Sequence, residues 1–230
     1  MQRGELLEGM KDALPIVLGY VPLGFAFGIL ANEAGMSVVQ ATAMSILCFT
    51  GAGQYIAIGV LQANGAVITA ILANILVNMR YFLFSTSLVP FLKDNVPSKI
   101  ATVLSYGLTD ETYAVAFNRY KFKKPTSSYI AGLNITSHIS WISSTFLGAL
   151  SGTLITNTDK MGLGFALPAM YTCLLVLVIS KRNDIIVAFI AAALCLWTGY
   201  VWPASMQNLS NIIIATVVAA TIGVIINDKR

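Results

Sequence analysis

The sequence predicts an all-α integral membrane protein that forms one polytopic domain over residues 1–230. Hydrophobic residues make up 57% of the chain and charged residues only 10%, against roughly 25% charged residues in a soluble domain. Mean hydropathy is +0.76. Apolar runs of roughly 20 residues, the length that crosses about 30 Å of hydrocarbon, recur from residue 13 onward.

The apolar runs predict about eight transmembrane segments, some of them discontinuous. They cover residues 13–31, 37–61, 65–91, 99–117, 127–152, 161–180, 184–203 and 209–226. The connections between them are too short to hold a soluble domain. The N-terminus shows no short apolar core followed by a small-residue cleavage site, so we predict no signal peptide.

The chain shows no sign of a metal or cofactor site. Cys48, Cys173 and Cys195 all lie in apolar runs, where a thiol behaves as a small hydrophobic group. No cysteine or histidine pair has metal-ligand spacing. The net charge of +4 does not indicate nucleic-acid binding, because basic residues of a membrane protein collect in its cytoplasmic loops.

The basic residues predict that both termini are cytoplasmic. Three basic clusters follow the fourth, sixth and eighth runs: Arg119 with Lys121, Lys123 and Lys124, then Lys181 with Arg182, then Lys229 with Arg230. With eight single crossings, however, Lys93 and Lys99 fall in a loop on the outside. The topology between residues 62 and 99 therefore stays open, and residues 80–91 have the alternative of a half-helix or re-entrant segment.

Three charged residues lie inside the apolar runs: Arg80, Asp110 and Glu111. A charge near the bilayer centre costs at least about 2.5–3.5 kcal/mol, so such residues usually face the interior of the protein or a wet cavity. Two interpretations of Arg80 remain open, a functional residue or one that reaches the interface from a helix ending near residue 79. For the carboxylates the alternatives are an ion pair with Arg80 and a site that binds protons or substrate.

Asp110 and Glu111 are predicted to have separate roles, because neighbouring residues on a helix point about 100° apart. On a continuous helix, Asp110 would share a face with Tyr106 and Tyr113, and Glu111 would share one with Gly107 and Ala114. His138, the only histidine, is either a hydrogen-bonded structural residue or a proton relay.

Proline and glycine residues predict breaks in the first two segments. Transporters use such breaks, because a helix N-terminus can meet a carboxylate and free carbonyls can meet an ammonium group. The alternative for Gly24 and Gly28 is close helix packing. The candidate breaks contain Pro22 and Gly24 in the first segment, and Thr50, Gly51, Gly53, Gln54 and Tyr55 in the second.

The third segment adds a polar row, because Asn74 and Asn78 lie four residues apart on one helix face. Two short echoes in the sequence, GFAFG with GFALP and LCFTG with LCLWTG, favour an inverted repeat in which segments 1–3 correspond to segments 6–8.

Four motifs taken in order, GYVPLGFAFG, FTGAGQY, NMRYFLFSTSLVP and YGLTDETYAV, resemble the AzlC family, the large subunit of bacterial branched-chain amino-acid exporters. The resemblance implies export of leucine, isoleucine, valine and in some members methionine across the bacterial cell (inner) membrane, with a small AzlD-type membrane subunit. Tyr81 and Phe82 depart from the pattern, since many members have a histidine there. The matching positions are Pro22, Gly24, Gly28, Gly51, Gly53, Gln54, Arg80, Asp110 and Glu111.

The favoured function is therefore a secondary transporter that moves branched-chain amino acids outward against proton entry. The alternative is a structural or assembly subunit whose partner forms the pathway. An enzyme is not expected, since HExxH and GxSG motifs are absent from the sequence. The substrate-binding candidates are Pro22, Gly24, Thr50, Gly51, Gly53, Gln54, Tyr55, Asn74, Asn78 and Arg80, and the proton-coupling candidates are Asp110, Glu111 and His138.

Overall fold

The computed structural model describes residues 3–63, 65–154, 165, 172, 175, 176, 179, 181–207 and 210–228. The described residues are helical throughout, as the sequence predicts. In chain order the elements are α1 (Arg3–Asp12), α2 (Leu14–Glu33), α3 (Val38–Leu47), α4 (Ala52–Gln62), α5 (Val67–Leu92), α6 (Ser98–Leu104), the 3₁₀ turn η1 (Ser105–Gly107), α7 (Asp110–Tyr120), α8 (Ser127–Gly152), α10 (Arg182–Val201), α11 (Ala204–Gln207) and α12 (Ser210–Asp228).

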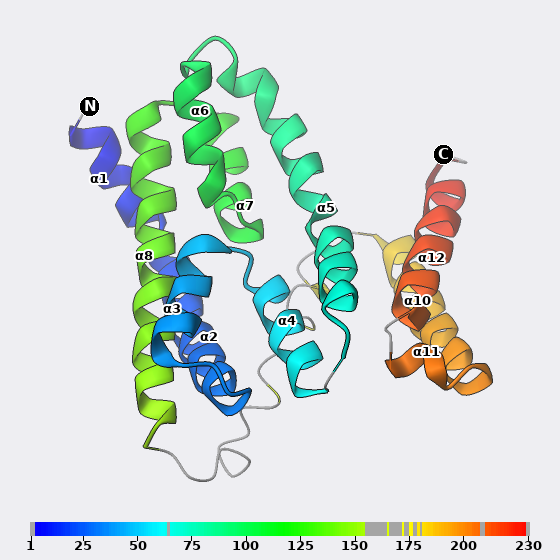
Figure 1. The fold of residues 1–230 in the computed structure, drawn as a ribbon. Coiled ribbons are helices and arrows are strands. Elements are labelled where there is room, and N and C mark those ends of the chain that lie inside the picture. Colours follow the sequence, from blue (N-terminus) through cyan, green and yellow to red (C-terminus); the bar gives the residue numbers. More distant parts are fainter. Residues whose placement is uncertain are drawn as a thin grey trace.

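Helix α8 is the scaffold on which α1, α2 and α3 pack (Figure 1). Glycines allow the backbones of α2 and α8 to touch. A Cβ at Gly28 would lie 2.2 Å from the Thr145 carbonyl oxygen, and one at Gly148 would lie 2.0 Å from the Phe25 carbonyl oxygen. Of the two interpretations of Gly24 and Gly28, the structure therefore favours close packing.

The segment 37–61 is not one crossing helix but a hairpin made of α3 and α4. A capping box at Ser37 and Gln40 starts α3, and the helix ends at Leu47. Gly51 has φ of +44°, a conformation that residues with a side chain rarely adopt, and it lets the chain reverse before α4 begins. The predicted break in this segment is thus present, but the chain turns back there, so that α3 and α4 run in opposite directions (Figure 1).

The segment 99–117 is a second hairpin, formed by α6 and α7. The short α6 passes into η1, and the chain turns before a Thr109 capping box starts α7. This placement corrects the prediction for the carboxylates, because Asp110 and Glu111 stand in the first turn of α7 and not in mid-helix. The expected rows with Tyr106 and Gly107 are wrong, since the helix is interrupted between those residues and Asp110.

Contacts between aromatic rings show on which side of the helical bundle the α6–α7 hairpin begins and ends. Phe91, at the end of α5, lies 5.7 Å from the Phe117 ring and 6.2 Å from the Tyr120 ring near the end of α7. Tyr120 in turn lies 6.3 Å from Tyr129 at the start of α8. The end of α5, the end of α7 and the start of α8 thus share the side on which α1 lies, here called the N-terminal side.

The α3–α4 hairpin enters from the opposite side (Figure 1). Helices α2 and α8 run parallel, since Gly24 packs on Ser144 and Asn32 packs on Gly152. Helix α3 therefore starts where α2 and α8 end, and α4 leads back to that side, where α5 begins. The prediction that 37–61 and 99–117 are single crossings is wrong, because the chain turns back at each break.

This arrangement resolves the difficulty with the loop after α5. Lys93 and Lys99 fall on the N-terminal side, together with Arg119 and its basic neighbours. The expectation that this loop lies on the other side was wrong because it counted the α3–α4 hairpin, which precedes the loop, as a crossing.

Two further expectations about broken helices are also corrected. Helix α2 continues from Leu14 to Glu33 with Pro22 inside it, so the first segment has no break. Helix α5 continues through Arg80 to Leu92, so residues 80–91 are neither a half-helix nor re-entrant. Arg80 does not reach out from a helix end but stands in the middle of α5.

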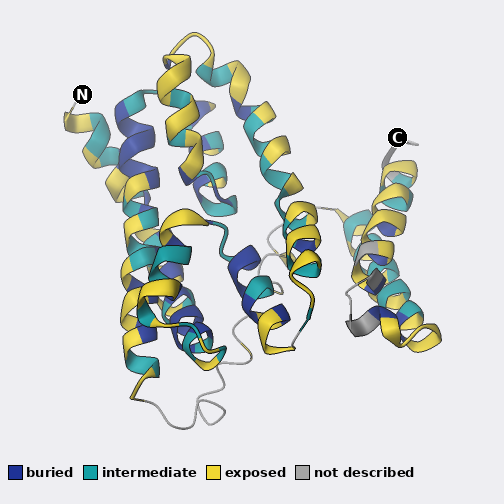
Figure 2. Cartoon of the chain, in the orientation of Figure 1, coloured by how far each residue is buried: buried dark blue, intermediate teal, exposed yellow. Residues whose placement is uncertain are grey.

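The C-terminal helices α10 and α12 pack against each other, joined by the short α11. The predicted segment 161–180 and the echo GFALP lie almost entirely outside the described residues, so the span count and the predicted repeat stay predictions. Within the described part of the chain, the helices that are long and apolar enough to cross a membrane are α2, α5 and α10. Much of α5 and α10 is exposed, whereas α2 and α8 are the most buried long helices (Figure 2).

Helix α1 is joined by ion pairs to the end of α7 and the loop that follows it. Arg119 donates to Glu5 at 2.8 Å and to Glu8 at 2.5 Å, and its guanidinium lies 3.8 Å from the centre of the Tyr129 ring. Lys123 adds a second contact to Glu8 at 3.0 Å. These contacts join the N-terminus to the end of α7, so the N-terminus and the 119–124 loop share one side.

The α2–α8 contact predicts that Gly28→Ala lowers thermal stability, because the new methyl group meets backbone atoms, 2.2 Å from Thr145 and 2.4 Å from Ala149. Overpacking of this kind costs about 1–3 kcal/mol. Gly19→Ala is the matched control on the same helix, since a Cβ there meets nothing within 4 Å. Thermal unfolding in detergent should give a lower Tm for Gly28→Ala alone; equal Tm values for the two variants would contradict the packing.

The α1 contacts predict a pH dependence outside the membrane. Hydrogen bonds from Arg119 and Lys123 hold the pKa of the Glu8 carboxyl below its ordinary value of 4.5. Since the pKa is lowered in the folded protein, this contribution is fully present above pH 4.5 and is lost as pH falls through the lowered pKa. Hydrogen exchange of residues 3–12, corrected for intrinsic rates, should accelerate in that range. Glu8→Gln should remove most of the acceleration, and an unchanged profile would contradict the assignment.

Candidate functional site

The tips of the two hairpins meet between the middles of α2, α5 and α8. Phe49, at the α3–α4 tip, stacks on the His138 ring at 4.4 Å, and Tyr106, at the α6–α7 tip, lies edge-on to the same ring at 5.5 Å. The Tyr106 hydroxyl donates to the Ile46 carbonyl, which ties one tip directly to the other. The site is therefore built around two interrupted helices.

Arg80 and Asp110 form an ion pair at this meeting point. Arg80 Nη2 lies 2.9 Å from Asp110 Oδ2, and the two side chains keep 27% and 22% of their accessible surface. The Arg80 Nε atom is buried and has no hydrogen-bond partner within the described part of the chain. Of the alternatives for the carboxylates, Asp110 thus makes the ion pair, and the Arg80 Nε donor is left without a partner in the described residues.

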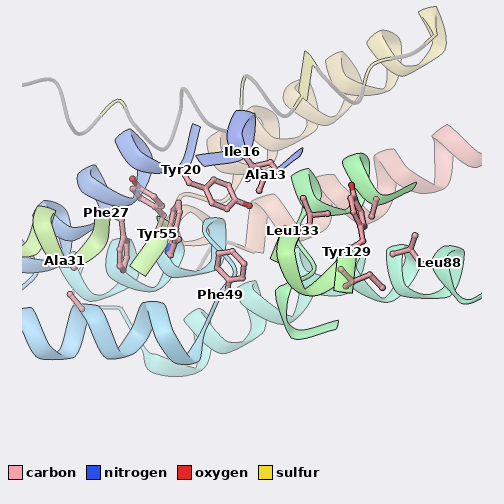
Figure 3. Packing of buried hydrophobic residues seen from close by; sticks show 14 of the residues in the cluster. Ala13, Ile16, Tyr20, Phe27, Ala31, Phe49, Tyr55, Leu88, Tyr129 and Leu133 are labelled. Atoms are coloured by element: carbon pink, nitrogen blue, oxygen red, sulfur yellow. The ribbon is translucent and has the colours of Figure 1, made fainter. Parts of the chain in front are cut away.

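Glu111 makes different contacts, in agreement with separate roles for the two carboxylates. Tyr20 Oη lies 2.7 Å from both Glu111 Oε2 and Thr109 Oγ1, and it donates to the carboxylate. Tyr20 is buried in α2, where its ring lies 5.3 Å from Trp141 and 5.9 Å from Phe49 (Figure 3). Both carboxylates stand in the first turn of α7.

The other tip is held from α5 by the asparagines that the sequence singled out. The Thr50 hydroxyl donates to Asn78 Oδ1 at 2.6 Å, and Asn74 Nδ2 donates to the Gly53 carbonyl at 3.1 Å. Asn74 is packed so closely that a Cβ at Gly53 would lie 2.0 Å from its Oδ1. The predicted polar row of α5 therefore faces the start of α4.

Gln54 and Tyr55 are tied into the packing around the tip. Gln54 is fully buried, accepts from Trp141 Nε1 at 2.8 Å and donates to Ser45 Oγ at 2.9 Å. The Tyr55 hydroxyl donates to the Leu23 carbonyl at 2.7 Å, and Figure 3 shows its ring among the core residues of α2. These contacts give both residues a role in shaping the break.

His138 has the geometry of the structural alternative. Its Nε2 lies 3.0 Å from the Ser45 carbonyl oxygen. Because a carbonyl only accepts, the proton of the neutral ring is assigned to Nε2. The imidazole thereby caps an α3 carbonyl that the helix end leaves without an intrahelical partner.

Two cavities flank the meeting point. The larger, about 460 Å³, lies between the α3–α4 hairpin, α5 and the α6–α7 tip, and Thr50, Gly53, Gln54, Asn74 and Asn78 are among the residues that line it. The smaller, about 30 Å³, is lined by the Arg80–Asp110 pair together with Tyr20, Gly51, Glu111 and other residues of the tips. Thr50, Phe49 and Tyr81 line both cavities, so they form the wall between them.

The predicted candidates therefore fall into two groups. Pro22, Gly24, Tyr55 and His138 line neither of these cavities, and Gly24 faces Ser144 of α8. The other candidates line one cavity or both. Among the described residues no group of three or more histidine, cysteine or carboxylate side chains could hold a metal ion.

Sequence reasoning missed Tyr20, Thr109 and Tyr81. A signal for Tyr20 was present, since it is the one hydroxyl-bearing residue of the apolar segment 13–31. Thr109 directly precedes the carboxylates, and T-x-x-T is close to the capping-box pattern that starts a helix. Tyr81 directly follows Arg80 and was noted only as a departure from the family pattern, not as a site residue.

Several known proteins are similar to this chain. The inner membrane protein YgaZ of Escherichia coli (strain K12) is 28% identical over 186 residues, which cover 79% of this chain and 76% of that protein. A protein of Archaeoglobus fulgidus described as an uncharacterized membrane protein is 34% identical over 170 residues, 73% of each chain. The branched-chain amino acid transport protein AzlC of Bacillus subtilis (strain 168) is 23% identical over 179 residues, 74% of this chain and 68% of that protein. No solved structure matches.

The relatives are named as membrane proteins, in agreement with the apolar helices of this multi-pass chain. The sequence model of the family described as AzlC protein matches residues 15–155, which include both hairpins and the whole of the proposed site. With more than half of its length matched to that model, the chain belongs to the AzlC family.

Proposed function

We propose that this chain is a secondary transporter that exports the branched-chain amino acids leucine, isoleucine and valine, and methionine if it resembles those family members that export it, coupled to proton entry and acting with a small AzlD-type membrane subunit in the inner membrane. Family membership supports the transport function, and the name of the Bacillus subtilis relative supports the substrate class. Lysines and arginines on the N-terminal side support a cytoplasmic placement of that side.

The observation that carries the proposal is the Arg80–Asp110 pair, where two interrupted helices meet. Charges inside a membrane protein are costly and usually mark the path of a substrate or proton. Interrupted helices near the middle of a transporter bind substrates through their exposed ends. The combination of both features in one place favours transport over a purely structural role.

The larger cavity suits a hydrophobic amino acid. Its volume of about 460 Å³ falls in the range of roughly 300–1,000 Å³ found for small-molecule pockets. Met44, Leu47 and Leu108 line it and offer an apolar surface for an aliphatic side chain. The start of α4 directs the positive end of its helix dipole at the tip, where a substrate carboxylate would be stabilised.

The charged residues line the smaller cavity, behind the wall formed by Phe49, Thr50 and Tyr81, so a substrate in the larger cavity would meet them once that wall moves. Arg80 would then donate to the substrate carboxylate, and Asp110 would accept from the ammonium group or take a proton. Either partner would have to leave the ion pair, which connects substrate binding to the charge state of Asp110. Glu111 is held by Tyr20 and is the second candidate for the proton.

The alternative, an assembly subunit whose partner forms the pathway, makes a different prediction for the isolated protein. Purified chain in liposomes should exchange labelled leucine for internal leucine if the pathway lies in this chain. Exchange that requires the small subunit and is unchanged by Asp110→Asn would favour the alternative.

Replacement of the central carboxylate should abolish transport. Asp110→Asn should reduce leucine exchange at least about tenfold, because it removes the partner of Arg80 and the acceptor for ammonium or proton; a tenfold loss corresponds to about 1.4 kcal/mol. Glu111→Gln should alter the pH dependence of export. Asp94→Asn, in the exposed loop after α5, is the matched control and should transport normally.

Exchange is measured in proteoliposomes at equal protein content, and pH dependence is measured by export against an imposed proton gradient. Parental rates and an unchanged pH profile in both Asp110→Asn and Glu111→Gln would overturn the assignment of these carboxylates.

A further inference from the structure

Helices α2 to α7 contain the same unit twice, in opposite orientations. Each unit is a long helix followed by a hairpin that turns back at mid-depth. The long helices end at Glu33 and Leu92, 59 positions apart, and the second hairpin helices, Ala52–Gln62 and Asp110–Tyr120, have 11 residues each and begin 58 positions apart. Figure 1 shows α2 and α5 running in opposite directions, with the hairpins entering from opposite ends.

Equivalent positions in the two units make equivalent contacts inside each unit. The fourth residue of the second hairpin helix is Tyr55 in one unit and Tyr113 in the other. Tyr55 packs on Phe27 of α2 at 5.5 Å and its hydroxyl bonds to Leu23. Tyr113 stacks on Phe84 of α5 at 4.2 Å and its hydroxyl lies 3.0 Å from Ser87 Oγ. Each tyrosine therefore fastens a hairpin to the long helix of its own unit.

A second pair of equivalent positions joins each unit to the other. Tyr20 of α2 and Asn78 of α5 are 58 positions apart, the same spacing as the hairpin helices. Tyr20 bonds to Thr109 and Glu111 at the α6–α7 tip, whereas Asn78 bonds to Thr50 at the α3–α4 tip. Each long helix thus holds the tip of the hairpin that belongs to the opposite unit.

The two kinds of contact respond differently to motion of one unit against the other. A contact inside a unit persists when that unit moves as a rigid body, whereas a contact between units must break. Inverted repeats of this kind allow one fixed site to be opened to either side in turn. The site lies between the two tips, so release of one tip opens it toward the side from which that hairpin enters.

We infer that Tyr20 and Asn78 are equivalent positioning residues that hold two gates, Tyr20 the α6–α7 gate toward the N-terminal side and Asn78 the α3–α4 gate toward the opposite side. The role of these contacts as gates rests on the proposed transport function. The contacts that carry it are present whatever the substrate is, so the gates can be tested without a substrate.

The experiment measures how fast a cysteine at each tip reacts with a membrane-impermeant maleimide, in vesicles of both orientations. Native Cys48 is the probe for the α3–α4 tip, with Cys173 and Cys195 replaced by serine. Leu108→Cys is the probe for the α6–α7 tip, with all three native cysteines replaced. Each probe is combined with Tyr20→Phe, with Asn78→Leu and with the control Tyr55→Phe, which removes a buried hydroxyl contact inside one unit.

Tyr20→Phe should raise labelling of Leu108→Cys from the N-terminal side at least about threefold and leave Cys48 labelling from the opposite side unchanged or lower. Asn78→Leu should do the reverse, and Tyr55→Phe should change neither rate. Unchanged rates in both gate variants, or a rise on the same side for both, would overturn the inference.

The labelling result separates this inference from the proposed function. If the variants change labelling on the expected sides but the chain does not exchange leucine, the gates are supported and the proposed substrate is wrong. If the chain exchanges leucine but labelling does not change, only the inference about the gates is wrong. Circular dichroism and gel filtration of each variant confirm that the chain is folded, and Tyr20→Phe keeps the ring in its packing with Trp141 and Phe49.

Discussion

Backbone groups exposed at a helix break have no water to bind inside a membrane, and this constraint shapes the centre of the structure. Each hairpin contains such a break at its tip, and side chains bond to the carbonyls that the helix ends leave without an intrahelical partner. Tyr106 bonds to Ile46, His138 to Ser45 and Asn134 to Leu104, all from distant parts of the chain, and Thr112 bonds to Gly107 within its own hairpin. Polar residues therefore gather at mid-depth because the two breaks are there, and the charged pair Arg80–Asp110 lies among them. The glycine-lined contact of α2 with α8 provides the rigid frame against which the breaks are held.

The sequence predicted the helical class, the limits of α8 and the break at FTGAGQY, because apolar length and local glycine chemistry decide these features. It did not predict that 37–61 and 99–117 turn back on themselves. A hairpin of two short apolar helices has the same length and composition as one crossing helix, so hydropathy alone cannot tell them apart. The basic residues carried the missing information: Lys93 and Lys99 contradicted eight single crossings, and the hairpins remove the contradiction. Pro22 led to the wrong prediction of a break in the first segment, because α2 continues through it.

The charged residues of the site could be predicted from the sequence, but the partner of each could not. Arg80, Asp110 and Glu111 stood out because they are the charges inside apolar runs. That Arg80 pairs with Asp110, and Tyr20 with Glu111, depends on how α2, α5 and α7 meet. The same geometry separates candidates that line the cavities from those that shape them. Thr50, Asn78 and Arg80 line the cavities, whereas the polar atoms of Tyr55 and His138 bond to backbone carbonyls around the tips. Gln54 does both, since it lines the larger cavity and bonds to Trp141. A transporter needs both groups, because a binding site at a helix break exists only while the break is held open.

The central claim, that two hairpins enter from opposite sides and meet at the Arg80–Asp110 pair, is tested most directly by the sides on which two loops lie. Single cysteines at Ala66, Asp94 and Phe122, in a chain without its native cysteines, can be labelled with an impermeant maleimide from either side of the membrane. Re-entrant hairpins predict that Asp94→Cys reacts from the same side as Phe122→Cys, and Ala66→Cys from the other side. Labelling of Ala66→Cys on the side of Phe122→Cys, with Asp94→Cys on the opposite side, would mean single crossings and would contradict the account.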